Sequence, residues 1–426
     1  MRCGMLHLWL VVPLTAAVLY GGVPALASET AGSEAAGSAP APPPSLPSAA
    51  PLAAPAPAVL SPSTPPGPAT PPSVVVPPAA VQAPPAQVVA PTPTPLPPHV
   101  PGPHVALILP LSSKAFSQHA LAVKDGFLAA ARAQGGTALP VNIYAVGDDP
   151  RQSVETYIAA LGAGARVVVG PLTRNGVTAL AESATVIVPT LALNVPERSI
   201  PDVPELYMLS LHAESEARQV AQLAWQDGRR TTLTVLGETQ LLRRIHHAFV
   251  EEFTRLGGTV LAPLPFTTDP EGLVRIKKAA DAAIDTETAD MVFMALDLPR
   301  ARLVRPYLST LPIYATSQVH PGVAGPLVAF DLTDVRFLDM PWLLQPEHPV
   351  VTVYPRPGYD ESIELTRFYA LGIDAFRIAM VLLGGKPGPA FDGVTGRLSL
   401  GQDAQFIRAL TAAQFNDGRL IVRERR

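Results

Sequence analysis

The sequence predicts an α/β protein of two lobes, each a doubly wound and mostly parallel sheet, behind a disordered segment rich in proline and alanine. From His104 onward, short apolar runs alternate with stretches of helical periodicity, which is the pattern of successive βα units. The alternation begins again near residue 230, so a second lobe is expected. Before this region, 25 of the 50 prolines lie between Pro40 and Pro103, where no packed core is expected.

Residues 1–27 have the three parts of a secretory signal peptide. Arg2 supplies a positive start, residues 8–20 form an apolar run, and an Ala-Leu-Ala cleavage site ends at Ala27. The run is shorter than the roughly 20 apolar residues that span a bilayer, and it contains Pro13. We expect cleavage after Ala27 and no membrane span in the mature chain. A structural helix and an uncleaved anchor are the alternatives.

Residues 28–103 are predicted to form a disordered linker. No Asp, Glu, Lys or Arg occurs between Ala35 and Ser113. Such a segment buries too little apolar surface to offset the entropy of ordering it, and its prolines favour extended polyproline II. The 64 residues from Pro40 to Pro103 would reach at most about 200 Å. The linker serves either as a spacer with a wide reach or as a connection without a length requirement.

The folded part, residues 104–426, is predicted to begin with the first lobe, at about residues 104–212. Its first strand is an uninterrupted apolar run ended by Pro110, as expected of a strand buried on both faces. Asp149 followed by Pro150 is typical of an N-cap with proline at the first helical position. We expect strands at 105–109, 141–145, 167–169 and 186–188, and helices at 116–134, 150–161 and 175–183.

The second lobe is predicted at about residues 230–325, after a helix at 213–226. Its strands are expected at 233–236, 259–264, 291–296 and 313–315, with helices at 240–256, 270–283 and 299–308. Chain beyond residue 328 contains a strand-like piece at 335–338, a helix at 362–383 that ends at two glycines, and a terminal hairpin. These C-terminal elements are assigned to the first lobe.

The composition argues against several classes of function. The formal charge is −4 and no Lys/Arg run precedes the Arg-Glu-Arg-Arg tail, so we expect no nucleic-acid partner. Cys3 is the single cysteine, and the adjacent His246 and His247 would point about 100° apart on a helix, so we expect no metal site. No phosphate-binding loop, nucleophile elbow or H-E-x-x-H motif occurs. The sequence therefore predicts neither an enzyme nor a cofactor.

Ligands of doubly wound sheets bind beyond the carboxyl ends of the strands. The candidate ligand-binding residues there have short or amide side chains, and they are Ser112, Ser113, Asn194 and Gln318. The same side chains are also suited to capping the helices that follow, so capping stays open as the alternative. Arg174 and Glu238 are the candidate charged pair for the two ends of an amino acid.

Several motifs of the folded part, taken in order, resemble one known family. They are Val105–Leu111, Lys124–Ala130, Val169–Leu172 with Asn175, Pro189–Asn194, Arg367–Ala375 and Gly393–Leu398. This set resembles the LppC/LpoA family of bacterial penicillin-binding-protein activators, which implies a type I periplasmic-binding-protein-like fold. The resemblance extends from His104 to about Leu400.

Members of that family are described as outer-membrane lipoproteins that stimulate a bifunctional peptidoglycan synthase through protein contact. This chain departs from the pattern twice. No cysteine for lipid attachment follows the apolar run, and the proline-rich segment stands where longer members have a helical-repeat domain. The resemblance implies a non-catalytic periplasmic regulator, associated with the outer membrane or cell wall, that binds and activates a bifunctional penicillin-binding protein. No partner-contact residue is carried over from the family.

A second hypothesis is a periplasmic solute-binding protein that closes its lobes on an amino acid or small amide. Ser112, Ser113 and Gln318 would then hold the small molecule in the interlobe cleft. A passive interaction or structural protein is a third hypothesis, which the sequence does not separate from the other two.

Overall fold

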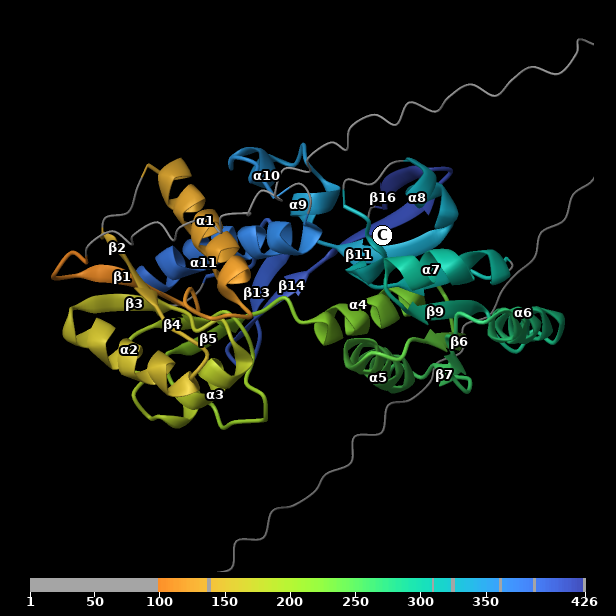
Figure 1. The fold of residues 1–426 in the computed structure, drawn as a ribbon, viewed down its shortest axis with the longest axis horizontal. Coiled ribbons are helices and arrows are strands. Elements are labelled where there is room, and N and C mark those ends of the chain that lie inside the picture. The colour runs from red at the N-terminus through yellow and green to blue at the C-terminus, as the bar shows by residue number, and fades with distance from the viewer. Residues whose placement is uncertain are drawn as a thin grey trace, which may run out of the picture. The chain divides into compact units, whose positions relative to one another are not determined.

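The computed structural model describes residues 99–135, 139–308, 310–322, 326–359, 362–385 and 388–423. All of them belong to one compact unit of the chain, Val88–Arg426. The signal peptide and nearly all of the linker that the sequence predicts lie outside the described residues. Two eight-stranded sheets form the two lobes (Figure 1). The α/β fold class with two mostly parallel sheets is therefore confirmed.

The first lobe is built on strands from both ends of the folded part. These are β1 (His104–Leu109), β2 (Val141–Ala145), β3 (Ala165–Val169), β4 (Thr190–Ala192), β5 (Leu206–Leu209), β12 (Phe391–Asp392), β13 (Arg397–Leu400) and β14 (Gln405–Ala409). Their order across the sheet is β12-β13-β14-β5-β4-β3-β1-β2, and pairing is parallel from β14 to β2. All six residues of β1 are buried, as its continuous apolar run predicts.

Two pairs of helices cover the first sheet. Helices α1 (Ser117–Ala133) and α11 (Ile363–Leu383) pack on one face, and α2 (Pro150–Gly162) and α3 (Arg174–Glu182) pack on the other. The Asp149 side chain accepts a hydrogen bond from the Arg151 N–H and begins α2, as the sequence predicts. Ser362 caps α11 in the same way.

The second lobe repeats this architecture. Its strands are β6 (Thr231–Leu236), β7 (Thr259–Val260), β8 (Leu264–Pro265), β9 (Met291–Ala295), β10 (Ile313–Ala315), β11 (Val335–Asp339), β15 (Thr411–Asn416) and β16 (Arg419–Arg423). The order is β16-β15-β11-β10-β9-β6-β7, and β8 pairs with β6. Helices α4 (Ala213–Gln226) and α5 (Gln240–Arg255) cover one face, and α6 (Pro270–Asp285) and α7 (Leu298–Val304) cover the other.

Short helices complete the fold around the longer elements. Helix α8 (Pro326–Asp331) packs against β15 and β16. Helices α9 (Pro341–Leu344) and α10 (Pro349–Thr352) lie between β11 and α11 in the chain and contribute to the core of the first lobe. Single 3₁₀ turns occur at Arg305–Tyr307 and Ser317–Val319. Among the described residues, no helix is both long and apolar enough to cross a membrane.

Three local expectations differ from the structure. The apolar run at 186–188 is not a strand, because its central residue Ile187 is 72% exposed and the pairing starts only with the Pro189 carbonyl. The strand expected at 259–264 is divided into β7 and β8, since Pro263 removes a donor from the ladder. The C-terminal elements divide between the lobes: α11 and β12–β14 join the first, whereas β11, β15 and β16 join the second sheet.

The contact between α1 and α11 is unusually close because a glycine of each helix faces the backbone of the other. A Cβ atom at Gly372 of α11 would overlap the carbonyl oxygen of Val123, and one at Gly126 of α1 would overlap that of Tyr369. The two helices bury Phe127 and Phe376 edge to face, with ring centroids 5.3 Å apart. Helix α11 therefore has a fixed position on the first sheet, which matters because its first turns reach the functional site.

Replacing Gly372 by alanine should force α1 and α11 apart and lower the free energy of unfolding by about 3 kcal/mol. The matched control is Gly162→Ala at the exposed end of α2, where a Cβ atom meets nothing within 4 Å. That control should leave stability unchanged or raise it by up to about 1 kcal/mol. Denaturant titration of both variants measures the difference, and equal effects would show that the close helix contact is not the cause.

Candidate functional site

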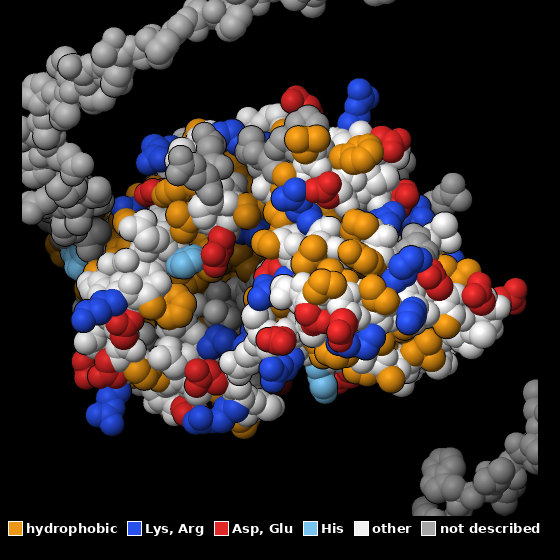
Figure 2. All heavy atoms as spheres, turned by 45° about the vertical axis from the view of Figure 1, so that its right-hand side comes forward, with side chains coloured by type: hydrophobic (Ala, Val, Ile, Leu, Met, Phe, Trp, Pro, Cys, Tyr) orange, Lys and Arg blue, Asp and Glu red, His pale blue; other side chains and the backbone are white. Residues whose placement is uncertain are grey.

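A cleft of about 540 Å³ lies between the two lobes, at the carboxyl ends of strands from both sheets. Figure 2 shows the surface hollowed there, with hydrophobic and basic side chains on its walls. The segments after β4, β10, β11 and β14 contribute to the lining, together with the first turns of α4, α5 and α11. The cleft is therefore at the position that the fold favours for a binding site.

The residues singled out from the sequence divide into two groups. Asn194, Gln318 and Arg174 line the cleft, whereas Ser112, Ser113 and Glu238 do not. Ser113 is buried, and its Oγ accepts hydrogen bonds from the N–H groups of Ala115 at 3.2 Å and Phe116 at 2.9 Å, so it closes the turn that precedes α1. Ser112 and Glu238 are exposed.

Both ends of the Asn194 side-chain amide are hydrogen-bonded to backbone groups of two neighbouring loops. Its Nδ2 donates to the Leu172 carbonyl at 3.0 Å, and its Oδ1 accepts from the Val195 N–H at 3.0 Å. These bonds tie the segments that follow β3 and β4 to each other. The side chain shapes the wall of the cleft through the loop that it fixes.

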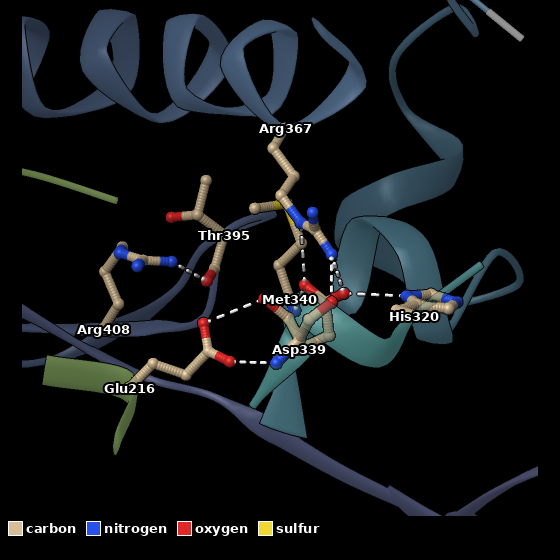
Figure 3. Close-up of polar contacts among 8 residues, drawn as sticks. Glu216, His320, Asp339, Met340, Arg367, Thr395 and Arg408 are labelled. Atoms are coloured by element: carbon tan, nitrogen blue, oxygen red, sulfur yellow. Dashed lines mark hydrogen bonds and ion pairs between the residues drawn. The ribbon is translucent and has the colours of Figure 1, made fainter. Parts of the chain in front are cut away.

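The charged groups of the cleft centre on the carboxylate of Asp339, the last residue of β11 (Figure 3). Arg367, on the first turns of α11, donates to it from Nη2 at 2.7 Å and from Nε at 3.4 Å. His320 donates from Nδ1 at 2.7 Å. Burial opposes the charge of Asp339, but Arg367 and His320 outweigh it and lower the pKa of this carboxyl to about 2. The pair joins the two lobes, since α11 packs on the first sheet and β11 belongs to the second.

Glu216, in the first turn of α4, is the second buried acid of the cleft. Its carboxyl accepts hydrogen bonds from the N–H of Ser317 and, at 3.0 Å, from the Ser317 hydroxyl. Burial and the neighbouring charge of Asp339 raise the pKa of Glu216 to about 7. Glu216 therefore holds its proton over a pH range in which an exposed glutamate is ionised.

Arg408, on β14, forms a different kind of contact. The residue is 7% exposed, and its guanidinium donates from Nε to the Ser210 carbonyl at 2.8 Å and from Nη1 to the Thr395 carbonyl at 3.1 Å. Both partners are neutral. The Thr395 turn is held in place by Asp374 of α11, which accepts from the Thr395 N–H at 2.8 Å and hydroxyl at 2.7 Å.

Sequence reasoning missed the four charged residues of this cluster as site residues. Arg367 belongs to one of the motifs that resemble the family, but Glu216, Asp339 and Arg408 carry no local signal. In the sequence, Glu216 resembles an acid at a helix start, Asp339 the end of a strand, and Arg408 a half-exposed strand residue. They meet because three separate chain crossings bring α4, β11, α11 and β14 to one place.

The raised pKa of Glu216 predicts a pH-dependent cost to stability. Between the pKa values of the unfolded and folded states, about 4.5 and about 7, the folded chain keeps a proton that the unfolded chain has released, so stability falls as pH rises. Relative to wild type, Glu216→Gln should therefore gain about 3 kcal/mol between about pH 4 and pH 8. Asp339 titrates below this window.

Urea unfolding of both proteins across that range measures the effect. The exposed residue Glu155 of α2 provides the control substitution, Glu155→Gln, which should follow wild type at every pH. A constant difference between Glu216→Gln and wild type would contradict the prediction.

The chain is similar to curated proteins named as penicillin-binding-protein activators and to several solved structures. The "Penicillin-binding protein activator LpoA" of Erwinia tasmaniensis is 26% identical over 325 residues, which are 66% of this chain and 48% of that protein. Its counterpart in Pantoea ananatis is 28% identical over 301 residues, or 61% and 44% of the two chains. The chain thus spans about half the length of the curated relatives it matches.

Solved structures share the same fold. A putative branched-chain amino acid ABC transporter from Chromobacterium violaceum is 39% identical, with a TM-score of 0.63 over 73% of this chain and 99% of that one. The LpoA C-domain from Haemophilus influenzae, a regulator of PBP1A, is 22% identical, with a TM-score of 0.61 over 75% and 100%. At that identity the second likeness shows the fold alone.

The sequence profile of the family described as LppC putative lipoprotein matches residues 99–418, which include both lobes and every strand of the cleft. The order of motifs from β1 to β13 predicted this family, and the profile confirms it. The chain belongs to the LppC family.

Proposed function

We propose that this protein is a non-catalytic, exported regulator of peptidoglycan synthesis that binds and activates a bifunctional penicillin-binding protein. The observation that carries the proposal is the likeness to curated penicillin-binding-protein activators over 61–66% of the chain, which takes in both lobes. The matched region is the part of the chain that the structure describes, so the partner would meet the folded unit.

The chemistry of the cleft supports a role in binding. Among the described residues, Asp339 is neutralised by Arg367 and His320, and Glu216 is bonded to Ser317. The Glu216 carboxyl accepts from both the N–H and the hydroxyl of Ser317, so these groups are occupied within the protein. These contacts fix the relative positions of the lobes, as a binding surface requires.

Activation by contact requires that the protein bind the active state of the synthase more tightly than the inactive state. The synthase population then shifts by the ratio of the two affinities. The proposal includes export to the periplasm, with residues 1–27 as the signal peptide and 28–103 as a linker that lets the folded unit reach a membrane-bound partner. The signal peptide and nearly all of the linker lie outside the described residues.

A second candidate function is binding of an amino acid or small amide in the cleft. It is favoured by the 39% identity to a putative branched-chain amino acid ABC transporter that the chain covers almost completely. Against it, an amino acid needs a free carboxylate for its ammonium group. Asp339 is already paired with Arg367, and Glu216 is bonded to Ser317. The third acid of the lining, Glu364, contacts His119 at 3.2 Å.

The activator proposal predicts that the full chain co-purifies with a bifunctional penicillin-binding protein from detergent-solubilised envelope of its own organism. Added to that synthase, it should raise the rate of glycan-strand synthesis saturably, because the effect follows occupancy of a complex. A solute-binding protein of the same fold and similar net charge is the control. An unchanged rate at saturating concentration would overturn the proposal.

The solute-binding alternative makes a separate prediction in a thermal-shift screen of branched-chain amino acids and small amides. A bound ligand at 100 times its dissociation constant stabilises the folded state by about 2.7 kcal/mol. We expect no saturable shift, because the carboxyl groups of Asp339 and Glu216 already have partners within the protein. A shift that is lost in Arg174→Gln, whose side chain lines the cleft, would move the assignment to this alternative.

A further inference from the structure

A second, smaller cavity of about 120 Å³ lies beside the cleft, where the chain crosses between the lobes. It is bounded by the crossing from β5 to α4 and by β14, just before that strand leads into β15. Its lining residues are Ser210, His212, Ser215, Arg218, Gln405, Phe406, Ile407 and Arg408. His212 and Arg408 also line the cleft, so they form the wall between the two spaces.

Every polar side chain that lines this cavity carries at least one hydrogen-bond donor, and the two arginines are donors only. Two guanidinium groups, one imidazole, two hydroxyls and one amide line it, and no carboxylate does. Carboxylates do occur nearby, but they face elsewhere. Glu214 pairs with Arg244 at 2.9 Å and Glu216 is bonded to Ser317. A donor-rich space without an acid matches the chemistry of an oxyanion.

Two polar atoms of the cavity wall are buried without a partner. The Oγ of Ser210, a residue only 5% exposed, and the Nδ1 of His212 have no hydrogen bond in the described part of the chain. Leaving such atoms unsatisfied costs about 1–3 kcal/mol each. Both residues lie on the same crossing segment and line the same cavity.

The N-terminus of α4 also makes this cavity favourable for an anion. His212 is the N-cap residue and its side chain makes no capping hydrogen bond to the first turn of this 14-residue helix. Helix N-termini carry a partial positive charge and favour anions. Here that end lies against a cavity that already holds two arginines.

The buried charge of Arg408 is the strongest electrostatic argument for an anion in this cavity. Its buried guanidinium forms no ion pair among the described residues and bonds only to neutral carbonyl groups. The nearby acids Asp339 and Asp374 pair with Arg367 and Arg377, and Glu216 is bonded to Ser317. Burial accordingly lowers the pKa of Arg408. A counter-ion in the cavity would compensate this charge.

We propose that this cavity is a binding site for a small tetrahedral oxyanion, of the phosphate or sulfate class, free or as the terminal group of a phosphomonoester. Arg408 and Arg218 supply the charge, and Ser210, Ser215 and His212 supply neutral donors. The site goes beyond the proposed activator function, since it does not require a synthase.

The site would join the two lobes. Arg408 belongs to β14 of the first sheet, whereas Ser215 and Arg218 belong to α4 of the second lobe. Gln219 of α4 already spans the same junction, with bonds to the Arg408 carbonyl at 2.8 Å and the Leu410 N–H at 3.0 Å. An anion held between these elements would favour one relative orientation of the lobes.

The test is the stability and binding of the full chain in the presence of inorganic phosphate, with sodium chloride at matched ionic strength as the salt control. We expect saturable stabilisation by phosphate and a shift of the His212 ring resonances in NMR, with chloride and acetate ineffective. Glycerol phosphate is compared with inorganic phosphate, and the tighter of the two identifies the source of the group. Equal effects of phosphate and chloride would overturn the proposal.

Two variants of one exposed ion pair are expected to change phosphate affinity in opposite directions. Arg218 donates to Glu251 at 3.2 Å, and both side chains are about half exposed, so neither change threatens the fold. Arg218→Gln should weaken phosphate binding by at least about tenfold, whereas Glu251→Gln, which releases Arg218, should strengthen it. Arg302→Gln on α7 breaks a comparable exposed pair with Asp331 of α8 and should match wild type. Equal affinities in all four proteins would mean that phosphate binds elsewhere, and the proposal would fail.

Discussion

The ion pair between Asp339 and Arg367 connects the two halves of this protein. Asp339 ends a strand of the second sheet, and Arg367 stands on the helix that the glycine contact of α1 and α11 fixes to the first sheet. Two opposite charges so deeply buried are stable only as a pair. His320 is the third member of this group. The charge of Asp339 acts on its neighbours: it raises the pKa of Glu216 and attracts the guanidinium of Arg408.

The cleft and the smaller cavity beside it differ in how their charges are satisfied. In the cleft, Asp339 is paired with Arg367, and Glu216 is bonded to Ser317. In the smaller cavity, two arginines and two residues with unpartnered atoms line a space without any acid among its lining residues. The first arrangement suits recognition of a partner by shape. The second suits a small anion that acts on the lobes through their junction.

Most of the fold followed from local patterns. The buried strand β1, the Asp149 cap and the long α11 are determined by apolar periodicity and capping residues, which act within a few positions along the chain. Of the candidate cleft residues, Asn194 and Gln318 line the cleft because they follow strand ends directly. Ser113 has the same sequence signal, yet its hydroxyl accepts hydrogen bonds within the turn before α1, since both uses require a short polar side chain at a strand-to-helix turn.

The sequence by itself determined the strand and helix order, the two-lobed class and the family, because these depend on periodicity and on motifs a few residues long. Only the tertiary structure decided that β15 and β16 join the second sheet. It alone brought Glu216, Asp339, Arg367 and Arg408 together from four distant segments. The way in which the chain crosses between the lobes determines which charges come together, and no local sequence pattern predicts those crossings.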